Sequence, residues 1–377
     1  MNNKPQTLKV RTWLEINRRA LASNYKVFRG LIKPGTKLMA VVKSNAYGNE
    51  LIGFSKELDT LGADYFGVDS ITEGLALRKA GITKPVLVLG YTINENIHVA
   101  TKNNICITLS SFDALNLLVK EKTPARVHIK IDSGMHRQGF FIKDVKKLSA
   151  ILLKNKQIVI EGVYTHFANA KNPSFTADTE NQAKEFEEAV EILMNAGFTF
   201  IKHASATSGA LLFPQYHFDM VRIGMGLSGL WPAQEVKRAL EKKIKLSPIL
   251  VWKTIIAEIK IIPKGERIGY NFTETFQKNT KVAICPIGYW HGFPRSLSSI
   301  GHVLIGGKRA RVLGRVSMDM ITVDVSDIEK TKMGDEVILI GKMGDEIITP
   351  EEVASYADSS SYEIVTRINP KIQRIFI

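Results

Sequence analysis

The feature that most constrains this chain is a regular alternation of short apolar runs and helical segments over roughly its first 230 residues. Most of the segments between the runs carry apolar residues at helical spacing. The eight runs cover residues 37–43, 65–69, 85–90, 105–109, 127–132, 159–165, 200–205 and 220–223. Eight such units in one domain predict an α/β fold of the (β/α)8 TIM-like barrel type, with a doubly wound open sheet as the alternative.

Beyond about residue 241 the pattern changes to β-like runs separated by turns that contain glycine and proline. In this part only residues 350–357 predict a helix. In the first part residues 73–79 and 178–194 do, and Thr179 with Gln182 forms a predicted capping box at the start of the second helix. We therefore expect two domains, a cofactor-binding barrel over residues 1–240 and a mainly β C-terminal domain over residues 241–377.

The composition argues against several classes of protein. No apolar run approaches the roughly 20 residues that a membrane helix needs, and the N-terminal MNNKPQTLKVRTW has no apolar signal core. The net charge of +14 comes from scattered lysines without interleaved aromatics, so we expect no nucleic-acid partner. Cys106 and Cys285 lie far apart and form no CxxC pattern. These observations predict a cytoplasmic protein with reduced thiols, no membrane contact and no metal site.

Polar residues follow five of the apolar runs, at the point where each predicted strand ends. Lys43 ends the first run, in AVVKSNAYG, where a lysine is placed to form a Schiff base. The others are Asp132 and Arg137 after the fifth run, His166 after the sixth, Ser205, Thr207 and Ser208 after the seventh, and Arg222 and Gly224 after the eighth. Because the carboxyl ends of barrel strands meet at one rim, these side chains predict a single site.

The residue types at this predicted rim indicate a phosphorylated cofactor. Thr207, Ser208 and the backbone amides near Gly224 suit the oxygens of a phosphate group. A lysine, a phosphate-binding segment and a histidine that can stack on a ring together point to pyridoxal 5'-phosphate.

The chain resembles the alanine racemase family over nearly its whole length. The stretches that carry the resemblance include AVVKSNAYG, VHIKIDSGMHRQGF, EGVYTHFA, VRIGMGLSG, PIGYWHGFPR and GRVSMDM. The resemblance implies a pyridoxal-phosphate-dependent isomerase of fold type III that interconverts L- and D-alanine and supplies D-alanine for peptidoglycan. It also implies a two-base mechanism, with one base on each face of the substrate carbon.

The resemblance implies roles for the matching residues. Lys43 would carry the cofactor and act as one base, and Tyr289 would be the second base. The implied cofactor contacts are Lys43, Tyr47, His166, Thr207, Ser208, Arg222, Gly224, Met225 and Tyr362. Substrate contacts fall on Arg137, Met318 and Asp319, and Lys130 would be a carbamylated lysine that orients Arg137. Tyr289 and Met318 come from the partner subunit in the family, so a homodimer with shared sites is implied.

The chain departs from the family pattern beside two of these residues. Asn49 and Glu50 stand where the usual loop has His-Gly, and Trp290 with His291 replace the usual Ala-Asp after Tyr289. The second departure leaves open a serine, lysine or broad-specificity racemase. A fold-type III decarboxylase is disfavoured because Arg222 cannot accept a proton. A non-catalytic pyridoxal-phosphate-binding protein is disfavoured by the β domain that carries Tyr289.

Overall fold

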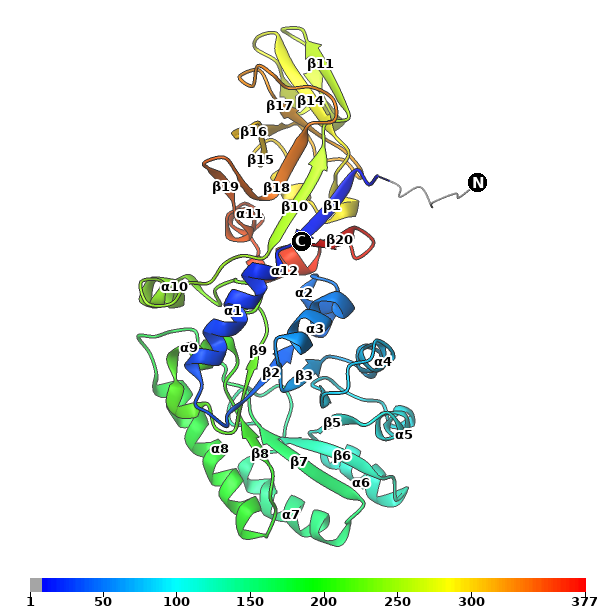
Figure 1. The fold of residues 1–377 in the computed structure, drawn as a ribbon, viewed down its shortest axis with the longest axis vertical. Helices are drawn as coiled ribbons and strands as arrows, with labels where there is room; N and C mark the ends of the chain where they lie inside the picture. Colours follow the sequence, from blue (N-terminus) through cyan, green and yellow to red (C-terminus); the bar gives the residue numbers. More distant parts are fainter. Residues whose placement is uncertain (1–8) are drawn as a thin grey trace. The chain divides into compact units, whose positions relative to one another are not determined.

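The structure is a computed structural model that describes residues 9–377, and it divides the chain into two compact units (Figure 1). The barrel unit comprises residues 19–47 and 51–248, and the β unit comprises the chain up to Arg18, residues 48–50 and residues 249–377. These units are discontinuous in sequence. The functional division into residues 1–240 and 241–377 stays a prediction. Most of the N-terminal segment in which a signal core was sought lies outside the described residues.

The barrel unit contains eight parallel strands in the order β8-β7-β6-β5-β4-β3-β2-β9. Their bounds are β2 (Lys37–Val41), β3 (Tyr65–Val68), β4 (Val86–Val88), β5 (Ile105–Leu109), β6 (Ala125–Lys130), β7 (Ile158–Tyr164), β8 (Ile201–His203) and β9 (Met220–Ile223). Backbone hydrogen bonds from Asp219 N to Lys202 O (3.0 Å) and from Arg222 N to Ser205 O (2.9 Å) link the two ends of the sheet. The sheet is thus a nearly closed barrel, which confirms the predicted fold over the open-sheet alternative.

Helices separate most of the strands of the barrel unit. They are α1 (Arg18–Leu31), α3 (Leu51–Thr60), α4 (Ile71–Lys79), α5 (Ile97–Lys102), α6 (Phe112–Lys120), α7 (Val145–Lys154), α8 (Ala177–Asn195), α9 (Thr207–Leu212) and α10 (Gln234–Leu240). The short element α2 (Lys43–Tyr47) is a left-handed turn. Side chains from several strands fill the barrel interior, namely Met39, Val41, Tyr65, Leu87, Cys106 and Met220. The interior is therefore packed, and polar chemistry is confined to particular strand positions.

The predicted capping box of Thr179 and Gln182 is wrong. The helix α8 begins at Ala177, so Thr179 lies inside its first turn with a buried hydroxyl. Gln182 instead reaches the loop after β7, where Oε1 accepts from Ala168 N (2.8 Å) and Nε2 donates to His166 O (3.4 Å). Backbone groups in a loop need partners, and the long amide side chain supplies them.

The β unit is built on a ten-stranded sheet in the order β11-β14-β17-β16-β15-β18-β10-β1-β20, with β19 paired to β18. Its strands are β1 (Thr12–Ile16), β10 (Leu250–Ile255), β11 (Glu258–Ile262), β14 (Thr280–Cys285), β15 (His302–Ile305), β16 (Lys308–Leu313), β17 (Ile321–Asp324), β18 (Glu336–Met343), β19 (Glu346–Ile348) and β20 (Gln373–Phe376). A separate hairpin joins β12 (Arg267–Ile268) and β13 (Glu274–Thr275). Neighbouring strands are antiparallel except β1 and β20, which confirms the predicted β-rich domain.

The β unit also contains two short α-helices. The predicted one is α11 (Pro350–Tyr356), where Thr349 Oγ1 accepts from Glu352 N (3.1 Å). The second, α12 (Ser361–Thr366), was not predicted. Over residues 9–377, none of the helices combines the length and the apolar character needed to cross a membrane. Cys106 and Cys285 are both buried free thiols.

Candidate active site

Lys43 opens a left-handed turn at the carboxyl end of β2. Residues 44–47 have φ angles between 52° and 56°, a region that a side chain with a Cβ atom rarely adopts. A hydrogen bond from Ala46 N to Val42 O (2.8 Å) ties the turn to the end of the strand. The backbone that presents the Lys43 amine is therefore held in an uncommon conformation, which nothing in the sequence pattern indicated.

Two acidic residues that sequence reasoning missed organise the surroundings of Lys43. Glu73, on α4, accepts from Asn45 N through Oε1 (3.0 Å) and from Asp69 N through Oε2 (2.9 Å). The Asp69 carboxylate lies 3.8 Å from Lys43 Nζ, and both side chains are partly exposed. The only signal in the sequence was the Ser70-x-x-Glu73 pattern, which is typical of an ordinary capping box.

Arg222 lies at the carboxyl end of β9 and is 3% exposed. Its guanidinium donates to Thr165 O and Ala204 O (both 2.8 Å), to His203 Nδ1 (3.0 Å) and to His166 Nδ1 (3.2 Å). Burial lowers the pKa of Arg222 to about 10, so it remains charged at neutral pH. Since guanidinium has donors and no acceptor, any group placed beside it meets a hydrogen-bond donor.

The histidines around Arg222 are uncharged. Burial first, and then the Arg222 charge, lower the pKa of His166 to about 3 and that of His203 well below its usual range. Because Arg222 donates to His203 Nδ1, the His203 proton must lie on Nε2, which is 2.9 Å from His128 Nδ1. His203 Nε2 therefore donates to His128 Nδ1, so the proton of the neutral His128 ring lies on Nε2.

The His128 ring belongs to a cluster of three polar side chains inside the barrel. Cys106, His128 and Glu161 bring potential ligand atoms within 4.8 Å of one another, and Cys106 Sγ donates to Glu161 Oε2 (3.1 Å). Burial raises the pKa of the Cys106 thiol, so it stays protonated. The hydrogen bond between Cys106 and Glu161 makes these two side chains part of the hydrogen-bonded interior of the barrel.

Tyr164, at the end of β7, is a further organising residue that the sequence did not single out. Its ring stacks on the His203 ring with centroids 4.9 Å apart. Lys130 Nζ and the Arg222 guanidinium lie 5.5 and 5.3 Å from its centroid. Its hydroxyl is 2.9 Å from Thr108 Oγ1. The Tyr164 ring therefore lies within cation–π distance of two buried basic side chains.

Lys130 is buried at the end of β6 and has an unusual charge state. Burial is the main cause, and the charges of Arg137 and Arg222 add to it, so that its pKa falls to about 8. Its Nζ donates to Gln138 Oε1 at 3.4 Å. A substantial fraction of this amine is neutral near pH 7.5, and the neutral amine is the form that reacts with carbon dioxide.

A second set of predicted residues meets beyond the ends of β8 and β9. Gly224 N donates to Thr207 Oγ1 (3.4 Å), and a Cβ atom at Gly224 would lie 2.6 Å from the Tyr47 hydroxyl. Ser208 and Met225, the neighbours of these residues in sequence, are also buried. Glycine at this position lets the Tyr47 ring approach the backbone closely, and the hydroxyls of Tyr47 and Thr207 with the Gly224 amide suit the oxygens of a phosphate.

Two predicted rim residues have local structural roles instead. Ser205 Oγ donates to Tyr216 O (2.8 Å). Asp132 Oδ1 accepts from Gly134 N (3.2 Å) and His136 N (2.9 Å), which holds the loop that continues to the exposed Arg137. Their position at strand ends was predicted, but their side chains are used by the neighbouring backbone.

The remaining predicted residues lie in the β unit. Tyr289 N donates to Ser317 O (3.1 Å) and Trp290 N donates to Met318 O (3.0 Å), so the structure brings Tyr289 beside Met318 and Asp319. The Tyr289 and Met318 side chains are 45% and 53% exposed. These two neighbouring side chains are thus available at the surface of the chain.

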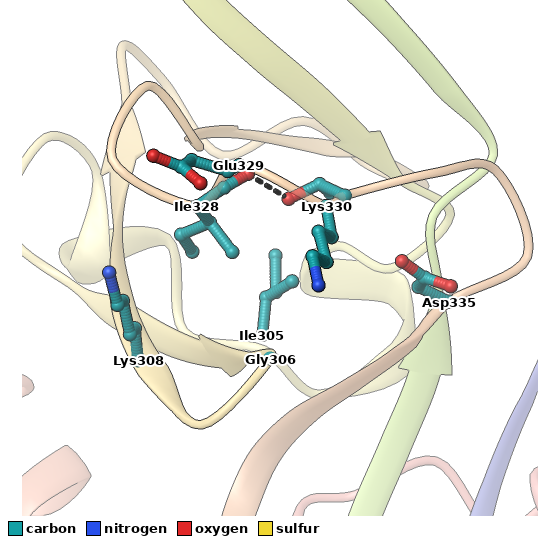
Figure 2. A pocket seen from close by; sticks show the side chains of 8 residues that line it. Ile305, Gly306, Lys308, Ile328, Glu329, Lys330 and Asp335 are labelled. Atoms are coloured by element: carbon teal, nitrogen blue, oxygen red, sulfur yellow. Dashed lines mark hydrogen bonds between the residues drawn. The ribbon is translucent and has the colours of Figure 1, made fainter.

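Tyr362 lies on α12 in the same unit, and burial raises its pKa to about 12. One cavity of the β unit, of about 340 Å³, is lined by Tyr289 and by residues that include Arg295, Glu363 and Arg367. Another, of about 390 Å³, lies between Lys308 and residues 328–335 and contains no predicted site residue (Figure 2). The cavity at Tyr289 is therefore the one that adjoins candidate chemistry.

These features define a class of protein: a (β/α)8-barrel enzyme whose rim offers a lysine, a donor-only cation and a cradle suited to a phosphate. Models of the alanine racemase N-terminal and C-terminal domains match residues 16–232 and 249–376. The alanine racemase of Leptospira interrogans serogroup Icterohaemorrhagiae serovar copenhageni is 36% identical over 373 residues, which cover 97% of this chain and 96% of the relative. The chain belongs to the alanine racemase family and is an amino-acid racemase.

Solved structures agree with this assignment. An alanine racemase from Bacillus anthracis with bound L-Ala-P is 34% identical, with a TM-score of 0.93 and coverage of 98% of this chain and 96% of that one. The alanine racemase of Bartonella henselae, solved with covalently bound pyridoxal phosphate, is 26% identical with a TM-score of 0.87 and covers 98% and 100% of the two chains. The family to which the chain belongs is pyridoxal-phosphate-dependent.

Proposed function

We propose that this chain interconverts L- and D-alanine with pyridoxal 5'-phosphate held in the barrel unit. The observation that carries the proposal is the environment of Arg222, a buried cation that donates to two carbonyls and two neutral histidines. When bound, the cofactor supplies a ring system that stabilises negative charge at the substrate α-carbon. Arg222 would donate to the ring nitrogen and leave it unprotonated, which favours return of a proton to the same carbon over loss of carbon dioxide.

The residues of the barrel unit fit such a cofactor. Lys43 Nζ would hold it, and the Tyr47 and Thr207 hydroxyls with the Gly224 amide would contact its phosphate, since glycine at 224 admits the Tyr47 ring beside this backbone. Ser208 and Met225 would add contacts, and the neutral His166 would lie against the ring face. From the β unit, the family resemblance adds the Tyr362 hydroxyl. Thr207 Oγ1 and the Gly224 amide are already close, which supports a preformed phosphate site.

Racemisation would use two bases and three substrate contacts. Tyr289 would take the α-proton from the L-isomer and Lys43 from the D-isomer, since one rigid base reaches only one face of the carbon. Arg137, Met318 and Asp319 would hold the substrate. Lys130 would be carbamylated and would orient Arg137, which the low pKa of Lys130 and its coupling to the Arg137 charge support.

We also propose a homodimer in which Tyr289 and Met318 complete the barrel site of the partner. Their half-exposed side chains in the single chain support this. Mixing inactive Lys43→Ala with inactive Tyr289→Phe should restore up to about a quarter of the wild-type activity, because only one kind of mixed site keeps both bases. Absence of rescue after verified subunit exchange would argue for sites within one chain.

The product would be D-alanine for peptidoglycan, made in the cytoplasm, where the two buried free thiols stay reduced. Serine, lysine or a broad range of amino acids are the alternative substrates, because Trp290 and His291 differ from the family pattern beside Tyr289. Incubation with a panel of L-amino acids, followed by chiral analysis of the products, separates these alternatives. A catalytic preference for another amino acid would contradict alanine as the substrate.

The sharpest test of the two-base proposal is Tyr289→Phe. In deuterium oxide the initial rate of deuterium entry into L-alanine should fall about a hundredfold more than the rate for D-alanine. Overall racemisation must slow equally in both directions because the equilibrium constant is unchanged. Proton NMR of the α-position measures both rates, and equal losses for the two isomers would reject Tyr289 as the L-specific base.

A further inference from the structure

The turn η5 (Tyr289–His291), which carries the candidate second base, lies between two glycines. Gly288 precedes it, and a Cβ atom there would lie 2.2 Å from Ser317 O and 2.4 Å from Met318 O. Gly292 ends it with φ of 99°. The turn is therefore in close contact with the segment that carries the candidate substrate residue.

His291 closes this turn with its side chain. Its Nδ1 accepts from Gly288 N at 3.2 Å, while its own amide donates to Gly288 O at 3.0 Å. On the other side its carbonyl accepts from Asn369 N at 3.1 Å. The imidazole is 11% exposed, so water competes little for the Gly288 amide. His291 thus holds the backbone N–H of Gly288, the residue before the tyrosine.

The charge state of His291 supports this role. To accept from Gly288, Nδ1 must keep its lone pair, so the ring must be neutral with its proton on Nε2. Burial lowers the pKa of His291. The Asp319 carboxylate, 4.0 Å from Nδ1, opposes that shift and Arg11 adds to it. The net lowering keeps the accepting form at neutral pH.

We propose that His291 is a positioning residue for Tyr289, because its imidazole holds the Gly288 amide and thereby fixes the direction in which the tyrosine leaves the turn. The inference rests on the proposed function of Tyr289 as the L-specific base. Such a base must lie within hydrogen-bond reach of the α-proton, and small displacements lower the rate steeply. A neutral acceptor adds no negative charge of its own, beyond that of Asp319, near a phenol that must ionise.

The first test compares two substitutions in the holoenzyme. His291→Leu removes the acceptor and should lower the initial rate of deuterium entry into L-alanine about tenfold more than entry into D-alanine. His291→Asn keeps a neutral acceptor and should stay within about twofold of the wild type. His302→Leu, at another histidine of the β unit outside the turn, is the matched control and should leave both rates unchanged. Thermal unfolding midpoints measured on all three variants show whether each is folded.

A third variant tests the charge. His291→Asp keeps an acceptor but adds a negative charge, so the pH at which L-alanine exchange reaches half its maximum should rise by about half a unit or more. Two results would overturn the inference while Tyr289→Phe still showed its L-selective loss. One is an equal loss of exchange for both isomers in folded His291→Leu. The other is a His291→Asn variant as impaired as His291→Leu. Absence of that loss in Tyr289→Phe would instead overturn the proposed function and this inference together.

Discussion

The two units hold their candidate residues in opposite ways. In the barrel unit Arg222, His166 and His203 are held by side-chain hydrogen bonds, and burial sets their charge states. In the β unit the Tyr289 and Met318 side chains are half exposed, and it is their backbones that are held, through the turn that His291 closes. The comparison shows two ways of positioning a polar side chain: a buried hydrogen-bonded network around Arg222, and a hydrogen-bonded turn that carries the half-exposed Tyr289.

The largest effect should follow loss of the barrel lysine. Lys43→Ala should lower racemisation by about 10⁴-fold or more, because it removes both the cofactor attachment and one base. Chiral analysis of alanine measures the loss, and borohydride reduction followed by peptide mass analysis should find no cofactor adduct. Lys79→Ala, at an exposed lysine of α4, is the control. A trapped adduct in the Lys43→Ala variant would show that the cofactor is attached to another residue and would contradict the assignment of Lys43.

The next effect tests the buried network itself. Arg222→Glu should slow racemisation by about a thousandfold and allow alanine to be converted to pyruvate, because a carboxylate would keep the ring nitrogen protonated. Enzyme-coupled detection of pyruvate measures the side reaction. Arg238→Glu, at an exposed arginine of α10, is the matched control. Normal racemisation without pyruvate would show that Arg222 does not face the ring nitrogen. The buried network of the barrel unit would then have no role in directing the reaction.

The buried histidines predict that acid weakens the barrel unit first. His128 has a pKa of about 4 in the folded chain because of burial, against about 6.5 when unfolded. Below pH 6.5 the unfolded chain therefore binds a proton that the folded chain refuses, and the free energy of unfolding falls as pH drops toward 4. His128 alone should contribute a loss of about 2 kcal/mol at pH 5.

Urea unfolding at pH 7.5 and pH 5.0 measures this loss, and hydrogen exchange read by mass spectrometry assigns it to a unit. His128→Asn should make the free energy of unfolding less dependent on pH, whatever it does to stability at pH 7.5. His291 and His302 in the β unit are also shifted downward by burial, but they are less enclosed. If amides of the β unit lost protection from hydrogen exchange at a higher pH than amides of the barrel unit, the predicted order of acid unfolding would be wrong.

The smallest effect should come from Glu73. Glu73→Gln replaces one of its two accepting oxygens with an amide donor, which would face the backbone N–H of Asn45 or Asp69. The turn after Lys43 should loosen, and racemisation should fall by about threefold to tenfold with little change in the α8 control Glu185→Gln. Steady-state kinetics measure the change. An unchanged rate would mean that the turn keeps its geometry without this carboxylate.

The eight barrel strands could be predicted because buried parallel strands read as short apolar runs, and the rim residues could be predicted because they follow those runs. The environments of these residues could not. Glu73 follows Ser70 in the pattern of a helix cap, and Ser70 Oγ accepts from Glu73 N (3.4 Å), but the Glu73 carboxylate accepts from the amides of Asn45 and Asp69. Thr179 and Gln182 have the same kind of pattern, and there the long-range partner of Gln182 replaced the cap.

Tyr164 was missed for a related reason. Its role comes from a ring stacked on His203 and from two cations beside it, which belong to three different strands. The spacing of residues along one strand does not predict contacts among side chains that come from several strands. Likewise α12 is only six residues long, too short for helical spacing to stand out among β-like runs.

The left-handed turn at residues 44–47 has a consequence for the order of assembly. Each residue there costs roughly 1–2 kcal/mol relative to a right-handed conformation, so the isolated segment would not adopt it. The conformation is sustained by Val42 at the end of β2 and by Glu73 on α4, which come together only when neighbouring barrel segments have packed. A nascent chain therefore presents no prearranged lysine to a free aldehyde. With Lys43 as the attachment point proposed above, the polypeptide must fold first and bind its cofactor afterwards.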